Sequence, residues 1–292
     1  MPLKLLTPPT ALPLHIADVR QHLKQDITDD DNLILLYLGA ATEFVQMRTQ
    51  RQLVAARYQL ILDGFPGPSL NSVPIGNAFS MPDFAIQIPR TPLIQIVSIT
   101  YTAMDGSTQT MPTSDYTVDQ SCEPPRITPV FGKIWPIPLP QIGSVKITFD
   151  AGYSAPITAN NTANTVTVSS WKALVAGDNV RLSNSGGALP APLLPKTDYF
   201  IQSIVSAGVY TLAAAAGGSV IDLTDTGSGL NFIGQPGLNN SPGELPDGIK
   251  SWMLLRCDSL YSYRGETANL RGTFTNLPYV DRLLDPYQVV SM

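Results

Sequence analysis

The sequence has few charged residues. Only 14% of its 292 residues are Asp, Glu, Lys or Arg, whereas an average globular domain carries about 25%. The 18 basic and 23 acidic residues leave a formal net charge of −5, and the basic residues form no run. Because sequence-independent binding to nucleic acid requires clustered Lys and Arg that neutralise phosphates, the composition argues against that function.

Long apolar runs and cysteines are scarce as well. The longest unbroken apolar run, Leu33–Leu38, is far shorter than the roughly 20 residues that cross a bilayer. The N-terminus has no apolar stretch of signal-peptide length. Cys122 and Cys257 lie far apart without metal-ligand spacing, which predicts two reduced thiols in an intracellular protein. We therefore expect no membrane association and no disulfide framework.

The motifs of common catalytic and cofactor sites are missing. The sequence contains no G-x-S-x-G, Walker A, G-x-G-x-x-G, H-E-x-x-H or C-x-x-C pattern. His15 and His22 lie too far apart for a chelating pair at i, i+4, so we expect surface or capping roles for them. The acidic run Asp29–Asp31 lacks the Gly and Glu of an EF-hand loop and is typical of a helix N-terminus. The sequence predicts no enzyme, no cofactor and no metal site.

Two groups of residues leave alternatives open. Asp222 and Asp225 could offer oxygens to a cation, but Asp and Gly in this stretch are also what a tight turn requires. Four aromatic residues could form a sugar-binding platform, although aromatic residues in strands more often lie in a core. They are Trp171, Tyr199, Phe200 and Tyr210.

Helical periodicity appears near both ends of the chain. It predicts helices over His15–Lys24, from Asp29–Asp31 to Arg51, over Asp247–Arg264 and over Tyr279–Leu284. In the second helix the i, i+3, i+4, i+7 pattern predicts a buried face. Its members are Leu33, Leu36, Tyr37, Ala40, Ala41, Phe44 and Val45.

The middle of the chain alternates like β-strands. Short β-type runs between Leu53 and Tyr153 predict a small antiparallel sheet, with a hairpin at Asp105-Gly106. From Ser154 to Leu245 small polar residues dominate, and strand-like runs there predict a separate β-module between hinges at Ala155-Pro156 and Gly237–Pro246. We expect an α+β fold: a helical core with a small antiparallel β-sheet at 1–153 and 246–292, plus an inserted all-β module at 154–245.

An ordered set of sequence blocks resembles the head-tail connector (adaptor) proteins of tailed bacteriophages. The blocks before the module are Lys4–Thr10, Thr28–Leu53, Ile86–Gly106, Tyr116–Asp119, Pro125–Ile127, Lys133–Pro136 and Phe149–Tyr153. The blocks after it are Leu245–Glu266 and Leu277–Val290. The chain departs from the family at Asp258–Tyr263, where a His-Trp-Tyr cluster is frequent. The module itself looks like a small β-module found in assorted phage structural proteins.

The resemblance implies a structural protein of the virion neck, made in the host bacterial cytoplasm. Such a protein forms a ring, of about twelve copies by the resemblance, between the capsid portal and the tail. Its expected partners are the portal protein, the next neck or tail-completion protein, and further copies of itself. Genomic DNA passes through the ring without sequence-specific binding, and no membrane is involved. The rival interpretations are a carbohydrate-binding or adhesive structural protein that uses the β-module, and a hydrolase with an unrecognised site.

The C-terminus carries the candidate partner site. Asp285-Pro286 ends the last helix, and alternating apolar residues follow as in an unpaired strand. Connectors of the family are expected to reach into the portal with this segment. It would bind there either by adding a strand to a portal sheet or by filling an apolar groove. The candidate portal-binding residues are Tyr287, Gln288, Val289, Val290, Ser291 and Met292. The alternative is that the tail folds back over the protein's own core.

Overall fold

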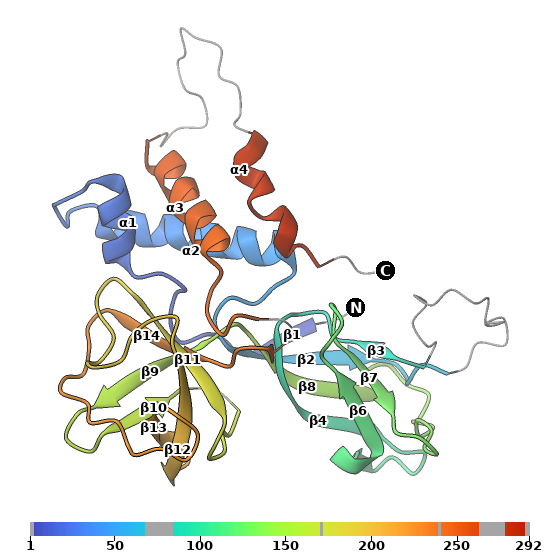
Figure 1. The fold of residues 1–292 in the computed structure, drawn as a ribbon. Helices are drawn as coiled ribbons and strands as arrows, with labels where there is room; N and C mark the ends of the chain where they lie inside the picture. Colours follow the sequence, from blue (N-terminus) through green and yellow to red (C-terminus); the bar gives the residue numbers. More distant parts are fainter. Residues whose placement is uncertain (1–2, 68–83, 170–171, 239–240, 263–277, 290–292) are drawn as a thin grey trace, which may run out of the picture.

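The computed structural model describes residues 3–67, 84–169, 172–238, 241–262 and 278–289. A layer of helices lies above two β units that stand side by side, a barrel and a sheet region (Figure 1). The sheets are antiparallel, and the fold belongs to the mixed α+β class, as expected. That the barrel interrupts a discontinuous core remains a prediction.

The helices form where the periodicity predicts them. They are α1 (Ile16–Leu23), α2 (Asp31–Thr49), α3 (Asp247–Ser262) and α4 (Pro278–Arg282). His15 caps α1, since its Nδ1 accepts a hydrogen bond from the Ala17 amide at 3.2 Å. Both α1 and α2 end at a residue in the left-handed conformation, Lys24 and Gln50. Short polar turns at these ends therefore fix the helix lengths.

The buried face of α2 differs from the prediction. Of the predicted face, Ala41 and Val45 are buried, but Leu36, Ala40 and Phe44 are exposed. Apolar residues occur nearly all round this helix, so periodicity alone does not select one face. The face of α2 that packs against α3 is the buried one. The buried residues of α2 are Ile34, Leu38, Ala41, Thr42, Val45 and Thr49.

The helical layer has its own core. Trp252 of α3 lies at its centre with 1% of its surface exposed. Its Nε1 donates to Asp281 Oδ1 at 3.1 Å, and its ring stacks on Phe44 at 5.2 Å between centroids. Burial raises the pKa of the nearby Cys257 thiol to about 11. Burying aromatic surface of this size contributes a large share of a domain's stability.

The sheet region combines two antiparallel sheets. The first has the order β1 (Leu3–Thr7), β2 (Ala56–Leu62), β8 (Val145–Ala151), β4 (Leu93–Thr102) and β5 (Thr108–Thr110). The second has the order β3 (Ile86–Gln87), β7 (Arg126–Pro129) and β6 (Tyr116–Asp119), preceded by the 3₁₀ turn η1 (Thr113–Asp115). The hairpin predicted at Asp105-Gly106 is confirmed, because Thr102 pairs with Thr108 and Gly106 has a φ of +83°.

The region after Tyr153 forms a closed six-stranded barrel. Its strands are β9 (Ala155–Asn160), β10 (Thr165–Val168), β11 (Asn179–Ser185), β12 (Asp198–Ser206), β13 (Val209–Ala213) and β14 (Leu230–Gly234). Ala155-Pro156 is not a hinge but the start of β9, where Ala155 pairs with Ile233. A proline is tolerated at the start of a strand, so this turn signal was misleading. The chain enters and leaves the barrel on adjacent strands.

Polar contacts fasten the barrel to the helical layer. The Asp18 carboxylate accepts hydrogen bonds from the Ser185 hydroxyl and from the Gly186 amide, the latter at 2.9 Å. The His15 amide in turn donates to the Ser185 hydroxyl at 2.7 Å. Lys196 pairs with Asp247 at 3.0 Å, which ties the barrel to the start of α3. The barrel is thus held at two points of the helical layer.

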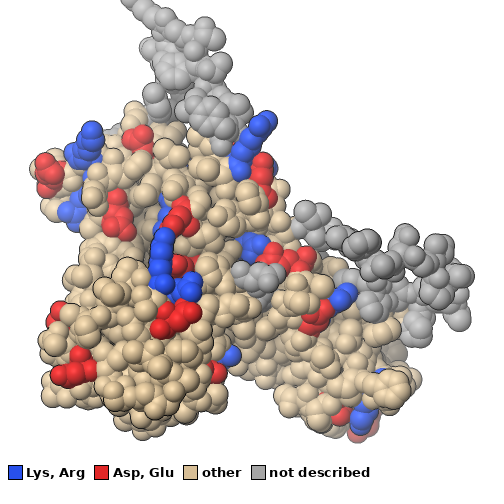
Figure 2. Space-filling model, in the orientation of Figure 1, with Lys and Arg blue, Asp and Glu red and all other residues tan. Residues whose placement is uncertain are grey.

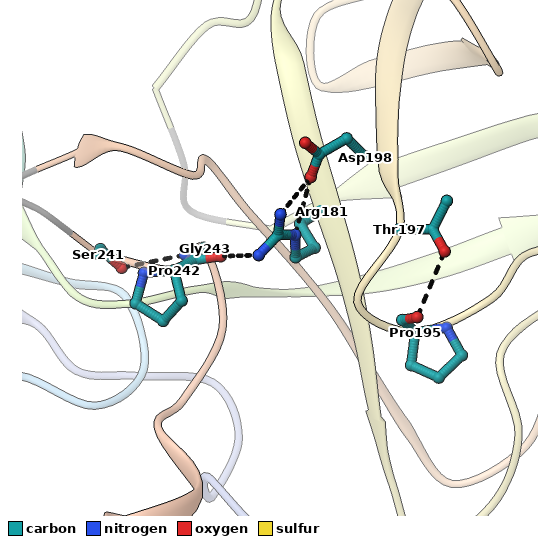
Figure 3. A network of polar contacts seen from close by, with 7 residues as sticks. All are labelled: Arg181, Pro195, Thr197, Asp198, Ser241, Pro242 and Gly243. Atoms are coloured by element: carbon teal, nitrogen blue, oxygen red, sulfur yellow. Dashed lines mark hydrogen bonds and ion pairs between the residues drawn. The ribbon is translucent and has the colours of Figure 1, made fainter.

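The segment that leaves the barrel is also packed rather than hinge-like. The Arg181 guanidinium bonds the Asp198 carboxylate and donates to the Pro242 carbonyl at 3.1 Å (Figure 3). A Cβ at Gly234 would lie 2.1 Å from the Gly243 carbonyl oxygen, so the two backbones are in direct contact. Only glycine permits this approach. The expected hinge at Gly237–Pro246 is buried at Ser241 and at Gly243–Leu245.

Candidate partner interface

The C-terminal segment does not form the strand that its alternation suggests. After α4 the chain makes a short 3₁₀ turn, η3 (Asp285–Tyr287), and residues 288–289 are in neither helix nor strand. The Val289 amide donates to the Thr49 carbonyl at 3.1 Å, at the end of α2. Val290, Ser291 and Met292 lie outside the described residues. Up to Val289, therefore, the segment is folded against the protein's own core.

Tyr287 is the centre of that attachment. Its ring packs against Gly248 in the first turn of α3, where a Cβ would lie 2.9 Å from the phenol oxygen. Its carbonyl accepts a hydrogen bond from Arg51 Nε at 2.7 Å. Gln288 is half-buried beside it. The side chain and the backbone of Tyr287 both fix where the chain leaves the helical layer.

Arg51 links this segment to the sheet region. The arginine side chain is 8% exposed and binds both carboxylate oxygens of Glu123. Burial alone would lower the pKa of Arg51, but its interactions with Glu123 and Tyr153 together outweigh burial, so the pKa is raised. Burial also raises the pKa of the neighbouring Tyr153 phenol to about 12. Arg51 is therefore a permanently charged link between α2, Glu123 and the C-terminal segment.

A cleft of about 420 Å³ opens at this junction. Its lining is Arg51, Ser121, Glu123, Tyr153, Ser241, Pro242, Pro246, Pro286 and Tyr287. The lining includes neither His nor Cys, and its one carboxylate is already paired with Arg51. In the part of the chain that the structure describes, no group of His, Cys, Asp and Glu could hold a metal ion. The lining of the cleft therefore offers no imidazole, no thiol and no unpaired carboxylate.

The polar residues that the sequence singled out have structural roles. Asp30 accepts a hydrogen bond from the Tyr261 hydroxyl at 2.5 Å, and Asp31 pairs with Arg20 at 3.1 Å. Asp222 accepts from Asn164 at 3.0 Å. Asp225 accepts from two backbone amides, at 2.8 Å and 3.0 Å. The interpretation of this stretch as a turn is confirmed.

The aromatic platform in the barrel is not supported. Tyr199 and Tyr210 are buried in the barrel core, and their hydroxyls accept hydrogen bonds from the Leu194 and Leu174 amides at 2.8 Å and 3.2 Å. Phe200 is half-buried. Trp171 lies outside the described residues. The core interpretation of the two tyrosines is confirmed, and they offer no flat face to a sugar.

The surface carries little charge of either sign. On the face shown in Figure 2, acidic and basic side chains lie next to one another and most of the surface is uncharged. None of the described helices is long and apolar enough to cross a membrane. Sequence analysis missed one prominent feature, an apolar loop at 131–142 in which Phe131, Ile134, Ile137 and Ile142 are exposed. Its signal was present as isoleucines among prolines outside any strand pattern.

Comparisons with known proteins concern the fold. No family model matches this sequence, and no curated protein matches it. A chain from the "virion of native gene transfer agent (GTA) particle" superposes with a TM-score of 0.54 and 16% identity, over 100% of this chain and 97% of that chain. A chain from the "neck of empty GTA particle computed with C6 symmetry" gives 0.53 and 15% over the same shares. The present chain, barrel included, therefore has the fold of chains found in the virion and neck of gene transfer agent particles.

Proposed function

We propose that this protein is a ring-forming head-tail connector (adaptor) in the neck of a tailed phage or phage-like particle. It docks under the portal, extends the DNA tunnel and presents an attachment surface to the next neck or tail protein. The main observation in support of this proposal is the fold, which the whole chain shares with chains from gene transfer agent virion and neck structures. The order of sequence blocks supports the same assignment independently.

A ring is the assembly that fits this role. One of the similar chains comes from a neck computed with C6 symmetry. A chain without internal symmetry builds a closed ring through heterologous contacts, in which two different surfaces of neighbouring copies meet. A copy number of about twelve follows from the resemblance to connectors.

The surface charge suits a tunnel through which DNA slides. A net charge of −5 without basic runs gives no cluster that neutralises phosphates. Acidic and basic groups are interspersed on the visible face (Figure 2). In the proposed ring, the protein surface would therefore not bind the DNA phosphates tightly. The role is structural, and no catalysis is needed for it.

The C-terminal segment is our candidate for the portal contact. Arg51 and Thr49 hold Tyr287 and Val289 against the helical layer. This attachment fixes the position of Val289, the residue that precedes Val290–Met292. Apolar side chains at a fixed exit suit an apolar groove or an added strand on the portal. We propose that Tyr287 and Val289 anchor this segment and that Val290–Met292 make the docking contact.

Removing Val290–Met292 should weaken docking without affecting folding. A chain that ends at Val289 keeps the contacts of Tyr287 and Val289, so we expect its melting temperature to equal that of the wild type. Its attachment to portal-bearing heads should weaken by about tenfold or more, because the docking side chains are gone. Co-sedimentation with heads that lack the connector measures this.

Truncation after Leu284 is the matched comparison. It also removes Tyr287, which leaves Arg51 with one partner fewer and uncovers Gly248. We expect this shorter chain to melt at a lower temperature. If the chain ending at Val289 attaches as well as the wild type, the portal contact lies elsewhere, and the proposed ring is unaffected by that result.

A further inference from the structure

The connection between β7 and β8 presents an unusual apolar surface. We refer to Phe131–Ile142 as the proline loop. Phe131 is fully exposed, and Ile134, Ile137 and Ile142 are exposed by between 78% and 93%. Single exposed apolar residues are ordinary, but four large ones within one short loop indicate a surface that a partner covers.

The proline loop is held in a defined shape. Trp135 is buried, stacks on Phe65 at 4.8 Å, and donates from Nε1 to the Phe84 carbonyl at 2.6 Å. The Leu139 amide donates to the Thr102 carbonyl at 2.8 Å. Prolines at 136, 138 and 140 restrict the backbone further. The exposed isoleucines are therefore presented on a rigid support, which lowers the entropy lost on binding.

A second uncovered apolar surface lies on α2. Leu36, Ala40, Glu43 and Met47 fall on one line along the helix, and we call them the α2 stripe. Leu36 and Met47 are 66% and 64% exposed, and the other two are exposed as well. The line is about 16 Å long at 1.5 Å per residue. On the flank toward α3, Phe44 lies under the Arg256 guanidinium at 5.9 Å.

The charges of the two surfaces are complementary. Lys133 is the only charged residue in Phe131–Ile142, and Glu43 is the only charged residue in Asn32–Met47. Lys133 has an acidic neighbour on its own chain, Asp115 at 3.5 Å, but its side chain is 57% exposed. An exposed pair of this kind contributes little to stability, so Lys133 can turn to another acid at low cost.

We infer that the proline loop of one copy packs on the α2 stripe of the next copy, with Lys133 opposite Glu43. This inference rests on the proposed ring and specifies its contact. The two surfaces belong to different parts of the molecule, the sheet region and the helical layer (Figure 1). A contact between unlike surfaces is heterologous, so each copy uses both surfaces, as a closed ring of identical copies requires.

Cysteine cross-linking tests the contact directly. Leu36→Cys and Ile134→Cys are made in separate chains that also carry Cys122→Ser, while the buried Cys257 stays. The chains are produced during particle assembly, oxidised, and resolved on a non-reducing gel. A disulfide-linked dimer should form when both variants are mixed and not with either alone. A chain with both cysteines should give a ladder, and Ile134→Cys with Val205→Cys on the barrel is the unlinked control.

Charge reversal supplies a second readout. Glu43→Lys should lower the yield of rings about tenfold, and adding Lys133→Glu should restore it to within about threefold of the wild type. Melting temperatures of the variants control for the neighbouring Asp115. If micrographs show rings but neither the mixed dimer nor the rescue appears, the inferred contact is wrong and the ring stands. If no ring forms from the wild-type chain, the proposed function itself is wrong.

Discussion

Replacing Arg51 with methionine should lower the free energy of unfolding by about 3 kcal/mol. Removing one partner of a buried ion pair leaves the other charge without compensation, and measured costs are about 3–5 kcal/mol. The lower end applies here, because Glu123 keeps 26% of its side chain exposed and regains some hydration. The hydrogen bond to the Tyr287 carbonyl is lost in addition. Chemical denaturation followed by circular dichroism measures the change.

A surface pair on the same protein is the control. Lys196 and Asp247 are 63% and 69% exposed, so Lys196→Met should cost less than about 1 kcal/mol. Glu123→Gln combined with Arg51→Met should cost less than the sum of the two single changes, because the two residues act as one unit. Equal, small effects of Arg51→Met and Lys196→Met would show that the Arg51 link does not hold the C-terminal segment.

Excising the barrel should leave a soluble chain that still joins heads to tails. Pro156 of β9 lies opposite Phe232 of β14, so residues 157–231 can be replaced by a two-residue Asn-Gly turn. The excision removes the contacts of Ser185 and Gly186 with the helical layer and also those of Arg181 and Lys196. These are five contacts, because Ser185 both accepts from the His15 amide and donates to Asp18; at about 1 kcal/mol for each, and less for the exposed Lys196 pair, the loss is roughly 4–5 kcal/mol. We expect one cooperative melting transition at a temperature lowered by about 10 °C.

The boundaries of that excision follow from the structure. A junction from Tyr153 to Leu245 would instead join two buried residues of the helical core directly and remove the paired ends of β9 and β14. Ser185→Ala in the full chain is the control for the lost contacts, because it removes those of Ser185 without changing the junction, and it should cost about 1 kcal/mol. An insoluble product, the absence of a cooperative transition, or a failure to join heads to tails would show that the barrel is integral to the connector.

Local patterns predicted the helices and the hairpin at Asp105-Gly106, and contacts between distant parts of the chain determined the rest of the fold. The α2 helix was predictable from its caps and composition, but its buried face was not, because Leu35 and Leu36 are as apolar as Ile34. Strands β9 and β14 were missed since proline and glycine mark their ends. These residues signal turns wherever they occur, and pairing across 70 or more residues is invisible to a local pattern.

The candidate site shows the same limit. The alternation of Tyr287, Val289 and Val290 suggested a strand, yet Arg51 and Thr49 supply hydrogen-bond partners that fold Tyr287 and Val289 onto the core. Nothing near the C-terminus in sequence announces those partners. The run of prolines and isoleucines in the proline loop can be seen in the sequence. Which of its side chains are exposed cannot, because Trp135 is buried while Ile134 and Ile137 are exposed.

The central claim is that copies of this chain form a closed ring in the neck of a particle. An electron cryomicroscopy map of that neck, from particles in which the chain carries a small tag, tests it most directly. We predict a closed ring of tagged density between portal and tail, of about twelve copies in head-to-tail contact. Tagged density at isolated positions, or dimers with isologous contacts, would contradict the account.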